Sequence, residues 1–523
     1  MAPPFSFSPE YWATLQINQK DLEALQTHLL EVETPLTAQD LTSVFVSWRI
    51  KAEQLAREDQ IKAAGKAYLP RETYAAGEEL VFPGLEWSRG KVLANRPGVN
   101  PEASAFGVIT VRMENGAERM FAAGLQDHPL NESPGDGTAA VGAAFDDIIE
   151  EHGESIQHKL EAALAADPAL VRIAGRWFPR GLLIDVSEGQ LNLAEAVLDM
   201  AQGEPQETSA LLKDVELPAG INLKLAEFSL NRALQDDERF DEVGPAGQVL
   251  WCLRRLEPEG VRQIPAFLQY QTIEHDRSVM DEAMLGLEAQ LDDELTEAAA
   301  AAGERKEVRE VTISLIYPHL RAGTLPLSAR TRALFPTAYE SPRVRFTLVD
   351  ARSGVKMPAW VVREHGYAFG LREWYKSHQL IPGSLVSVRQ GQRPGEVIVE
   401  AKTQRSSKDW IRTLMVGADG GMVFAMLKQP ITAEFNDRMA IHVGDFDVLD
   451  PIWEKKRSFE EQVVSVMREL TKVSPQGHVH AQELYAAINL VRRVPPAPLL
   501  CLLTTQDRFV HVGDLHFKLE EGA

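Results

Sequence analysis

One pattern of apolar and polar residues occurs three times along the chain. An apolar stretch with helical spacing is followed by Asp, then by an aromatic residue or Leu beside Val or Ile, then by Gly and a short hydrophobic strand. The copies are Leu160–Pro179, Leu230–Leu253 and Leu500–Leu519. A recurring unit in a sequence indicates a repeated structural element. Each copy is interpreted as the last helix of a helical trio followed by a short β-hairpin.

The N-terminal region also has helical periodicity. Leu22–Val32 carries apolar residues at helical spacing, and Thr37 stands before an acidic first turn that contains Asp40, which is typical of a helix N-cap. The next helix is expected from Ala38 to Glu58. Two interpretations stay open: the start of a helix-turn-helix domain, or an unspecialised helical hairpin.

Residues 68–130 change to the alternating pattern of β-strands. Four strands are expected, in GEELVFP, GKVLANR, FGVITVRM and ERMFAAGL. Asn115-Gly116 lies between the last two, and this dipeptide is a strong signal for a tight hairpin. The strand pattern resembles that of a small KOW-like barrel, a module common in transcription and translation factors. A barrel with a purely structural role is the alternative.

The second half of the chain mixes both patterns. Residues 276–308 are predicted to form one long acidic helix, because Met280, Met284, Leu287, Leu291 and Leu295 fall on a single stripe. Residues 309–450 are predominantly β. A helix over Phe369–Gly383 is expected to interrupt them and to end at a Pro-Gly turn. Residues 458–523 contain the last helical trio and its hairpin, with Gly513-Asp514 at the turn.

Charge divides the chain into contrasting blocks. The formal net charge of the 523 residues is −22, which by itself argues against a nucleic-acid ligand. Between Arg309 and Arg412, however, 17 Lys and Arg stand against 8 Asp and Glu, a net charge of +9. Between Asn131 and Val308 the numbers are 14 and 36, a net charge of −22. One basic module therefore lies in an acidic chain, and the acidic block favours solubility or contact with a basic partner.

Composition excludes several classes of protein. No apolar run approaches the ~20 residues that a membrane helix needs, and the first residues lack the pattern of a signal peptide. Cys252 and Cys501 both lie in apolar surroundings, so they are interpreted as small buried side chains and not as a disulfide. A cytoplasmic location and no membrane contact are expected.

The third copy is similar to a known family. The segment FEEQVVSVMRELTKVSPQGHVHAQELYAAINLVRRVPPAPLLCLLTTQDRFVHVGDLHFKL resembles the winged-helix module of the RNA polymerase delta subunit, which belongs to the HARE-HTH group. The shared features are an apolar first helix, a second helix with Glu-Leu, and the R-F-x-x-V-G hairpin. The resemblance covers about 60 residues here and about 30 in each earlier copy. It implies winged helices and a role at nucleic acid or the transcription machinery.

The basic module resembles a second family. FTLVDARSGVKMPAWVV followed by GLREWYKSHQLIPGSLVSVR is similar to the plant-type DNA-binding pseudobarrel, whose architecture also occurs in the DNA-reading domains of some restriction enzymes. Gly383-Ser384 stands where that pattern has Gly-Asp. The resemblance implies a DNA-reading barrel, and a generic β-barrel is the alternative.

These patterns together predict an α+β multidomain fold with repeated winged helix-turn-helix units and two small β-barrels. The expected domains are a helical or winged-helix-like domain (1–67), a KOW-like barrel (68–130), two winged helices (143–200 and 201–275), an acidic linker helix (276–308), a basic pseudobarrel-like domain (309–450) and a C-terminal winged helix (455–523).

Basic and aromatic residues of the 309–450 module and of the C-terminal domain are the candidate nucleic-acid-binding residues. Arg and Lys neutralise phosphates, Arg can also read guanine, and interleaved aromatic side chains such as Trp360, Tyr375 and Trp410 can stack on bases. The alternative is a solvated basic barrel with buried aromatic residues. The candidates are Arg321, Arg330, Arg332, Arg343, Arg345, Arg363, Arg372, Trp374, Lys376, Arg405, Lys408, Arg412, Arg492 and Arg493.

Catalytic chemistry has weaker support. Glu400 and Lys402 form a Glu-x-Lys strand end, which with Glu396 and an upstream carboxylate such as Asp350 would fit the metal site of a nuclease. His478 and His480 have no Cys or carboxylate pair beside them, so no zinc site is expected. The sequence contains no phosphate-binding Gly loop of the Walker type. No cofactor and no metal are predicted.

The sequence therefore predicts a non-catalytic nucleic-acid-binding protein, with DNA as the expected ligand and a place in transcription or on the chromosome. One alternative is an interaction scaffold that docks on RNA polymerase or another protein of the transcription machinery. A second alternative is a DNA-processing nuclease that uses Glu400.

Overall fold

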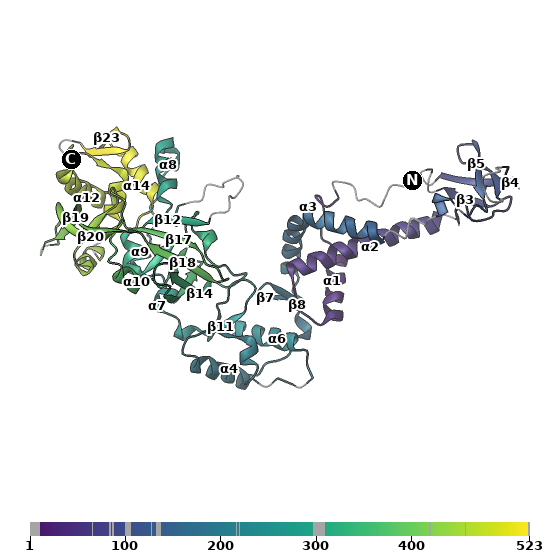
Figure 1. The fold of residues 1–523 in the computed structure, drawn as a ribbon, viewed down its shortest axis with the longest axis horizontal. Coiled ribbons are helices and arrows are strands. Elements are labelled where there is room, and N and C mark those ends of the chain that lie inside the picture. Colours follow the sequence, from purple (N-terminus) through teal and green to yellow (C-terminus); the bar gives the residue numbers. More distant parts are fainter. Residues whose placement is uncertain are drawn as a thin grey trace. The chain divides into compact units, whose positions relative to one another are not determined.

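The computed structural model describes residues 11–520 apart from 65, 83–84, 86–87, 100–105, 127, 132–137, 216, 219, 297–308, 418–419 and 455–456. The side chains of 54, 56–64, 138–144 and 405–407 are also outside the description. The chain is a multidomain protein of mixed α and β structure (Figure 1). It forms two compact units, Met1–Ile184 with Asn222–Phe228, and Asp185–Ile221 with Ser229–Ala523.

Three helices and a three-stranded sheet make the helical part of the first unit. They are α1 (Gln19–Val32), β1 (Leu36–Thr37), α2 (Ala38–Ala64), α3 (Thr138–Ala166), β7 (Leu170–Ile173) and β8 (Arg176–Pro179). The predicted N-cap of α2 is confirmed, because Thr37 Oγ1 accepts a hydrogen bond from the Asp40 backbone N–H at 3.1 Å. Strand β8 pairs antiparallel with β1 and with β7. All three helices contribute to one apolar core.

A five-stranded sheet lies between α2 and α3 in the sequence. Its strands are β2 (Lys66–Ala67), β3 (Glu79–Phe82), β4 (Ser88–Pro97), β5 (Gly107–Met113) and β6 (Glu118–Ala123), and they neighbour each other in chain order. The predicted Asn115-Gly116 turn joins β5 to β6, with Gly116 at a φ of 79°. Tyr68, Phe82 and Phe121 fill the interior of this sheet.

The second unit begins with another helical trio and hairpin. The elements are α4 (Glu188–Met200), β9 (Gln206–Glu207), α5 (Thr208–Leu211), α6 (Leu223–Asp236), β10 (Phe240–Glu242) and β11 (Leu250–Leu253). The first turns of α6 are counted with the first unit. The buried Asn231 Oδ1 accepts a hydrogen bond from Trp251 Nε1 at 2.8 Å, which fixes α6 against β11.

A seven-stranded sheet forms the centre of the second unit. Its strands are β12 (Glu310–Ser314), β13 (Thr324–Pro326), β14 (Arg343–Asp350), β15 (Lys356–Val362), β16 (Tyr367–Phe369), β17 (Leu385–Gln390) and β18 (Glu396–Ala401). Their order is β12-β17-β18-β14-β15-β16-β13, and β14 pairs parallel with β18. The helices α7 (Glu259–Arg262), α9 (Tyr317–Ala322) and α10 (Arg372–Ser377) accompany it. The helix expected over Phe369–Gly383 is shorter because Gly370 and Gln379 have positive φ angles.

A long hairpin follows and packs on the C-terminal helices. The elements are β19 (Thr403–Val416), β20 (Met422–Ala433), β21 (Ile441–Val443), α11 (Asp450–Trp453), α12 (Phe459–Val473), β22 (Val479–His480), α13 (Ala481–Ile488), α14 (Pro496–Thr505), β23 (Phe509–Gly513) and β24 (His516–Leu519). Leu414 and Phe424 of the hairpin share one core with Val463 and Met467 of α12. The boundary predicted near residue 450 therefore falls inside a common core.

The predicted acidic helix over residues 276–308 is much shorter in the structure. Helix α8 runs over Glu282–Leu291, and Asp292 ends it in the left-handed conformation with a φ of 50°. Residues 297–308 lie outside the described part of the chain. Among the described helices, none has the length and apolarity that crossing a membrane requires.

The three copies of the sequence pattern share one local topology. In each, a two-residue strand before the second helix pairs with the second strand of the hairpin, which places Leu36 opposite Trp177, Gln206 opposite Trp251 and Val479 opposite Phe517. The three aromatic side chains are buried.

The grouping of the first two copies differs from the predicted boundaries. The predicted 1–67 and 143–200 domains share one core, formed by α1, α2 and α3 with their hairpin, and α4 belongs to the next copy. The physical reason is that the five-stranded sheet interrupts the first copy between its second and third helices. The second and third helices of the first copy, α2 and α3, therefore share a core although the five-stranded sheet separates them in the sequence.

Candidate nucleic-acid interface

Two of the predicted arginines attach the second copy to the seven-stranded sheet. Arg343 Nη1 forms an ion pair with Asp241 and lies 3.4 Å from Glu257 Oε2. Arg345 pairs with Glu204 at 3.3 Å and lies over the ring of Trp360. Because both guanidinium groups are mostly buried in these contacts, they hold two parts of the second unit together and are not available to phosphate.

The carboxylates around this junction have raised pKa values. Burial raises the pKa of Glu242 to about 8, and the nearby Glu340 and Asp241 add to the effect. Burial and Asp241 likewise raise the pKa of Glu257 to about 8. The Arg345 backbone N–H donates to the Val243 carbonyl at 2.7 Å, so main-chain bonding also joins β14 to the second copy.

Arg321 and Arg412 are likewise engaged within the protein. Arg321 Nη2 lies 2.7 Å from Asp447 and 3.0 Å from Asp450, and its guanidinium covers the ring of Phe267. Arg412 Nη1 pairs with Glu483 at 2.7 Å. The second contact fastens the hairpin to α13.

The C-terminal pair of arginines is engaged within the protein. Arg493 is fully buried, and its Nη2 lies 2.6 Å from Asp293 Oδ1 and 2.7 Å from Glu294 Oε1. Arg492 is partly buried, lies over Phe459 and contacts Gln462 at 3.3 Å. The burial of Arg493 does not agree with the expectation that it contacts phosphate, because positive charge in the sequence does not reveal an internal partner.

Helix α14, the last helix of the C-terminal trio, is also covered. Nearly all residues from Pro496 to Leu503 are buried. The segment that contains α8 lies on it, since Cys501 Sγ contacts the Asp276 carbonyl at 3.3 Å and Thr504 Oγ1 contacts Met284 Sδ at 3.5 Å. This helix therefore cannot enter a groove of DNA in the described arrangement.

The remaining candidates on the seven-stranded sheet are exposed. Trp374 is an exception, since it is buried against Tyr375 and His378. Lys376 pairs with Glu373 at 2.9 Å. The exposed candidates lie on different elements, and they are Arg330, Arg332, Arg363 and Arg372.

One surface of the hairpin combines an exposed aromatic ring with exposed lysines. Cross-strand pairing places Trp410 opposite Lys428, Lys408 opposite Pro430 and Arg412 opposite Met426. Residues directly opposite in an antiparallel pair project to the same face. The exposed members of this face are called the hairpin platform here, and they are Lys408, Trp410, Met426, Lys428 and Pro430.

The packing of the hairpin explains why the platform stays exposed. Next to the turn, Leu414 and Phe424 on the same face are 4% exposed because they pack into the C-terminal core. On the other face, Ile411 and Ile431 form a small core with Ile381. The first face is thus anchored near the turn by Leu414 and Phe424, and the platform continues this face away from the turn.

The platform has an unusual combination of exposure and charge. Trp410 is 63% exposed, whereas Trp360 and Trp374 are 5% and 4% exposed. Lys428 Nζ lies 5.4 Å from the centroid of the Trp410 ring. Neither Lys408 nor Lys428 makes an ion pair with a residue that the structure describes. The side chain of Arg405, also predicted for this surface, lies outside the described residues.

Met426, Lys428 and Pro430 were not among the predicted residues. Their signal in the sequence is the alternation along β20, which puts them on one face at every second position. That face can be recognised only when the register of β20 against β19 is known.

The carboxylates considered for a nuclease do not converge. Asp350 pairs in register with Val399 on the parallel strand β18, and both are buried, so both point to the interior of the sheet. Glu400 follows Val399 and points to the opposite face, where it lies 3.1 Å from Lys402. Among the described residues no group of three metal-ligating side chains has the geometry of a metal site.

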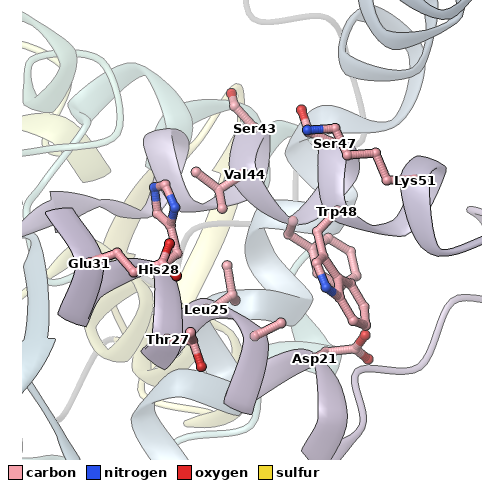
Figure 2. A pocket seen from close by; sticks show the side chains of 12 residues that line it. Asp21, Leu25, Thr27, His28, Glu31, Ser43, Val44, Ser47, Trp48 and Lys51 are labelled. Atoms are coloured by element: carbon pink, nitrogen blue, oxygen red, sulfur yellow. The ribbon is translucent and has the colours of Figure 1, made fainter.

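The first unit contains a separate groove between α1 and α2 (Figure 2). It has a volume of about 650 Å³, its floor includes Leu25, Phe45 and Trp48, and polar side chains such as His28 and Lys51 line its rim. Sequence reasoning did not identify it. Asp21 also lines the groove, but its carboxylate is buried and bound by Arg49 at 2.7 Å.

Comparison of the chain with protein-family models, with curated proteins and with solved structures gives no match.

Proposed function

We propose that this protein binds nucleic acid without catalysis and that the hairpin platform is the contact surface. The observation that carries the proposal is the 63% exposed Trp410 flanked by Lys408 and Lys428, two lysines with no described carboxylate partner. Lysines supply affinity for phosphate, and an exposed indole offers a stacking surface for bases.

The repeated helical units take a supporting role in this proposal. Their topology fits the winged-helix resemblance of the sequence, yet α14 is covered by the segment that contains α8. Ion pairs such as Arg343–Asp241 and Arg412–Glu483 join copies two and three to the β-structure. The winged helices would then hold the platform in place and would not read DNA themselves.

Binding to labelled oligonucleotides at low salt tests the proposal. The double variant Lys408→Ala/Lys428→Ala is expected to weaken binding and to lower the slope of log K against log salt by about one or more. The matched control is Lys356→Ala/Lys472→Ala, which removes two exposed lysines that are already paired with Glu396 and Glu469.

Two outcomes would contradict the proposal. The first is no detectable binding at low salt. The second is binding that survives the double lysine variant unchanged but is lost in Arg363→Ala/Arg372→Ala, which would place the contact on the seven-stranded sheet.

An interaction scaffold remains the second candidate because α3 exposes a row of acidic side chains. These are Asp146, Asp147, Glu150, Glu151 and Glu154. Such a face suits a basic protein better than nucleic acid. Absence of nucleic-acid binding together with retention of a partner that is lost on charge reversal of Glu150 and Glu154 would favour this candidate.

A further inference from the structure

We propose that the form of nucleic acid bound by the hairpin platform is a single strand, with a base stacked on the indole ring of Trp410. This inference rests on the proposed function and specifies its ligand. It is carried by the exposure of Trp410, by the alternation of apolar and basic groups on the platform, and by the packing of Ile411 and Ile431 on the hairpin's other face.

Trp410 presents a large aromatic ring to solvent, where a ligand could cover it. Large aromatic side chains stabilise a fold when they are buried. In the second unit Trp251, Trp360 and Trp374 are at most 5% exposed. Trp410 instead directs an apolar ring to solvent from the middle of a regular strand pair, where a polar residue would serve the fold as well.

The platform alternates apolar and basic groups along both strands. On β19, Lys408 and Trp410 are two residues apart, and on β20 the order is Met426, Lys428, Pro430. Positions two residues apart on a strand are separated by about 6.8 Å. Each lysine therefore lies next to the indole, so a backbone phosphate and its base can contact neighbouring side chains.

A duplex fits this surface poorly. A two-stranded ribbon can enter a major groove, but here Ile411 and Ile431 on the opposite face pack into a core with Ile381, while Leu427 on that face is 37% exposed. The ribbon is thus partly covered on the face opposite the platform. Bases in a duplex are also stacked on each other, and extracting one costs a few kcal/mol, whereas a single strand offers its base faces freely.

Lys428 already occupies the position of a bound cation over the ring. Its Nζ lies 5.4 Å from the Trp410 centroid. An arriving base can displace the ammonium, which then meets the phosphate beside it. The ammonium group of Lys428 thus exchanges its contact with the indole ring for a contact with the phosphate.

The experiment compares a labelled oligothymidine of about 15 nucleotides with a duplex of the same length by fluorescence anisotropy at low salt. The full-length protein is expected to bind the single strand more tightly. Trp410→Leu is expected to weaken single-strand binding about 5- to 150-fold, the range that corresponds to the loss of one base–aromatic stack. Trp410→Phe, which keeps a smaller aromatic face, is expected to retain most of the affinity.

The outcomes separate this inference from the function on which it rests. Equal or tighter duplex binding that is unaffected by Trp410→Leu would overturn the single-strand inference and leave nucleic-acid binding standing. Failure to bind either probe would overturn both. Because the Trp410 side chain is exposed, Trp410→Leu is expected to unfold at the same temperature as the parent protein, and a lower temperature would show that Trp410 serves the fold.

Discussion

Arg493 and Asp293 form an ion pair from which water is excluded: Nη2 of the arginine lies 2.6 Å from Oδ1 of the aspartate, and neither side chain is exposed. Tyr485 Oη donates to the same carboxylate at 2.5 Å, and Glu294 binds both Arg493 and His319. Desolvated charges of this kind are tolerated only when every partner is present. The cluster therefore fixes the residues after α8 against the C-terminal trio.

Removing the arginine should destabilise the second unit strongly. Arg493→Leu leaves Asp293 and Glu294 without their cation in a buried site, and we expect a loss of about 3–5 kcal/mol in the free energy of unfolding. Chemical denaturation measures this loss. The matched control is Arg508→Ala, whose side chain is 44% exposed and pairs with Glu460 at 3.1 Å, and which should cost less than about 1 kcal/mol. Equal small losses for both variants would contradict the prediction.

The junction between the second copy and the seven-stranded sheet should weaken as pH rises. Folding raises the pKa of Glu242 and of Glu257 from 4.5 to about 8. A carboxyl group with a raised pKa favours the folded state below its ordinary pKa, and this contribution is lost as pH rises through the raised value. Stability is therefore expected to fall between pH 5 and 8, as followed by urea unfolding. Glu242→Gln should flatten this dependence, and an unchanged slope would exclude Glu242 as its source.

Gly383 should not tolerate a side chain. Its φ is 93°, and an added Cβ would lie 2.6 Å from the backbone of Ala440. Gly383→Ala is expected to lower stability by more than the ~1 kcal/mol that the backbone conformation alone accounts for. Gly395→Ala is the matched control, because Gly395 has a φ of 77° with open space around it. Thermal unfolding of the two variants distinguishes conformational strain from steric overlap, and equal shifts would argue against overlap.

Both thiols should be unreactive in the folded protein. Cys252 and Cys501 are 2% and 3% exposed. Burial raises the pKa of Cys252 to about 11 and also raises the pKa of Cys501. Since the thiolate is the reactive form, a chromogenic disulfide reagent at neutral pH is expected to modify the cysteines only after denaturant is added. Rapid modification of either thiol without denaturant would show local opening around it.

Local features of the fold followed from the sequence, and long-range ones did not. The Thr37 cap and the Asn115-Gly116 turn depend on neighbouring residues, so short-range rules predicted both. Helix α8 ends where Asp292 adopts a left-handed backbone conformation, and the residues on either side of Asp292 do not predict that conformation. The composition of the first helical core depends on residues more than 100 positions apart, and periodicity carries no information on such pairing.

For the candidate site, too, the sequence indicated local features but not long-range contacts. An excess of positive charge over 309–412 correctly located a region rich in arginine, yet the excess could not indicate which guanidinium groups have internal partners. Arg343 pairs with Asp241, and Arg345 pairs with Glu204; both carboxylates lie in the acidic block. The blocks of opposite charge are thus partly complementary within one chain. Lys428 was not predicted, because it lies outside the segment 309–412 in which the positive charge is concentrated.

The insertion of the five-stranded sheet into the first copy bears on the order in which the chain folds during synthesis. Arg176 Nη1 donates to the carbonyl of Pro35, a contact that spans 141 positions. Strands β3 to β6 pair only with neighbours in the sequence, so they can form as soon as they leave the ribosome. The helices α1 and α2 must wait for residues beyond 170. During that interval their apolar faces lack the partners that cover them in the folded unit, so a chaperone could bind them.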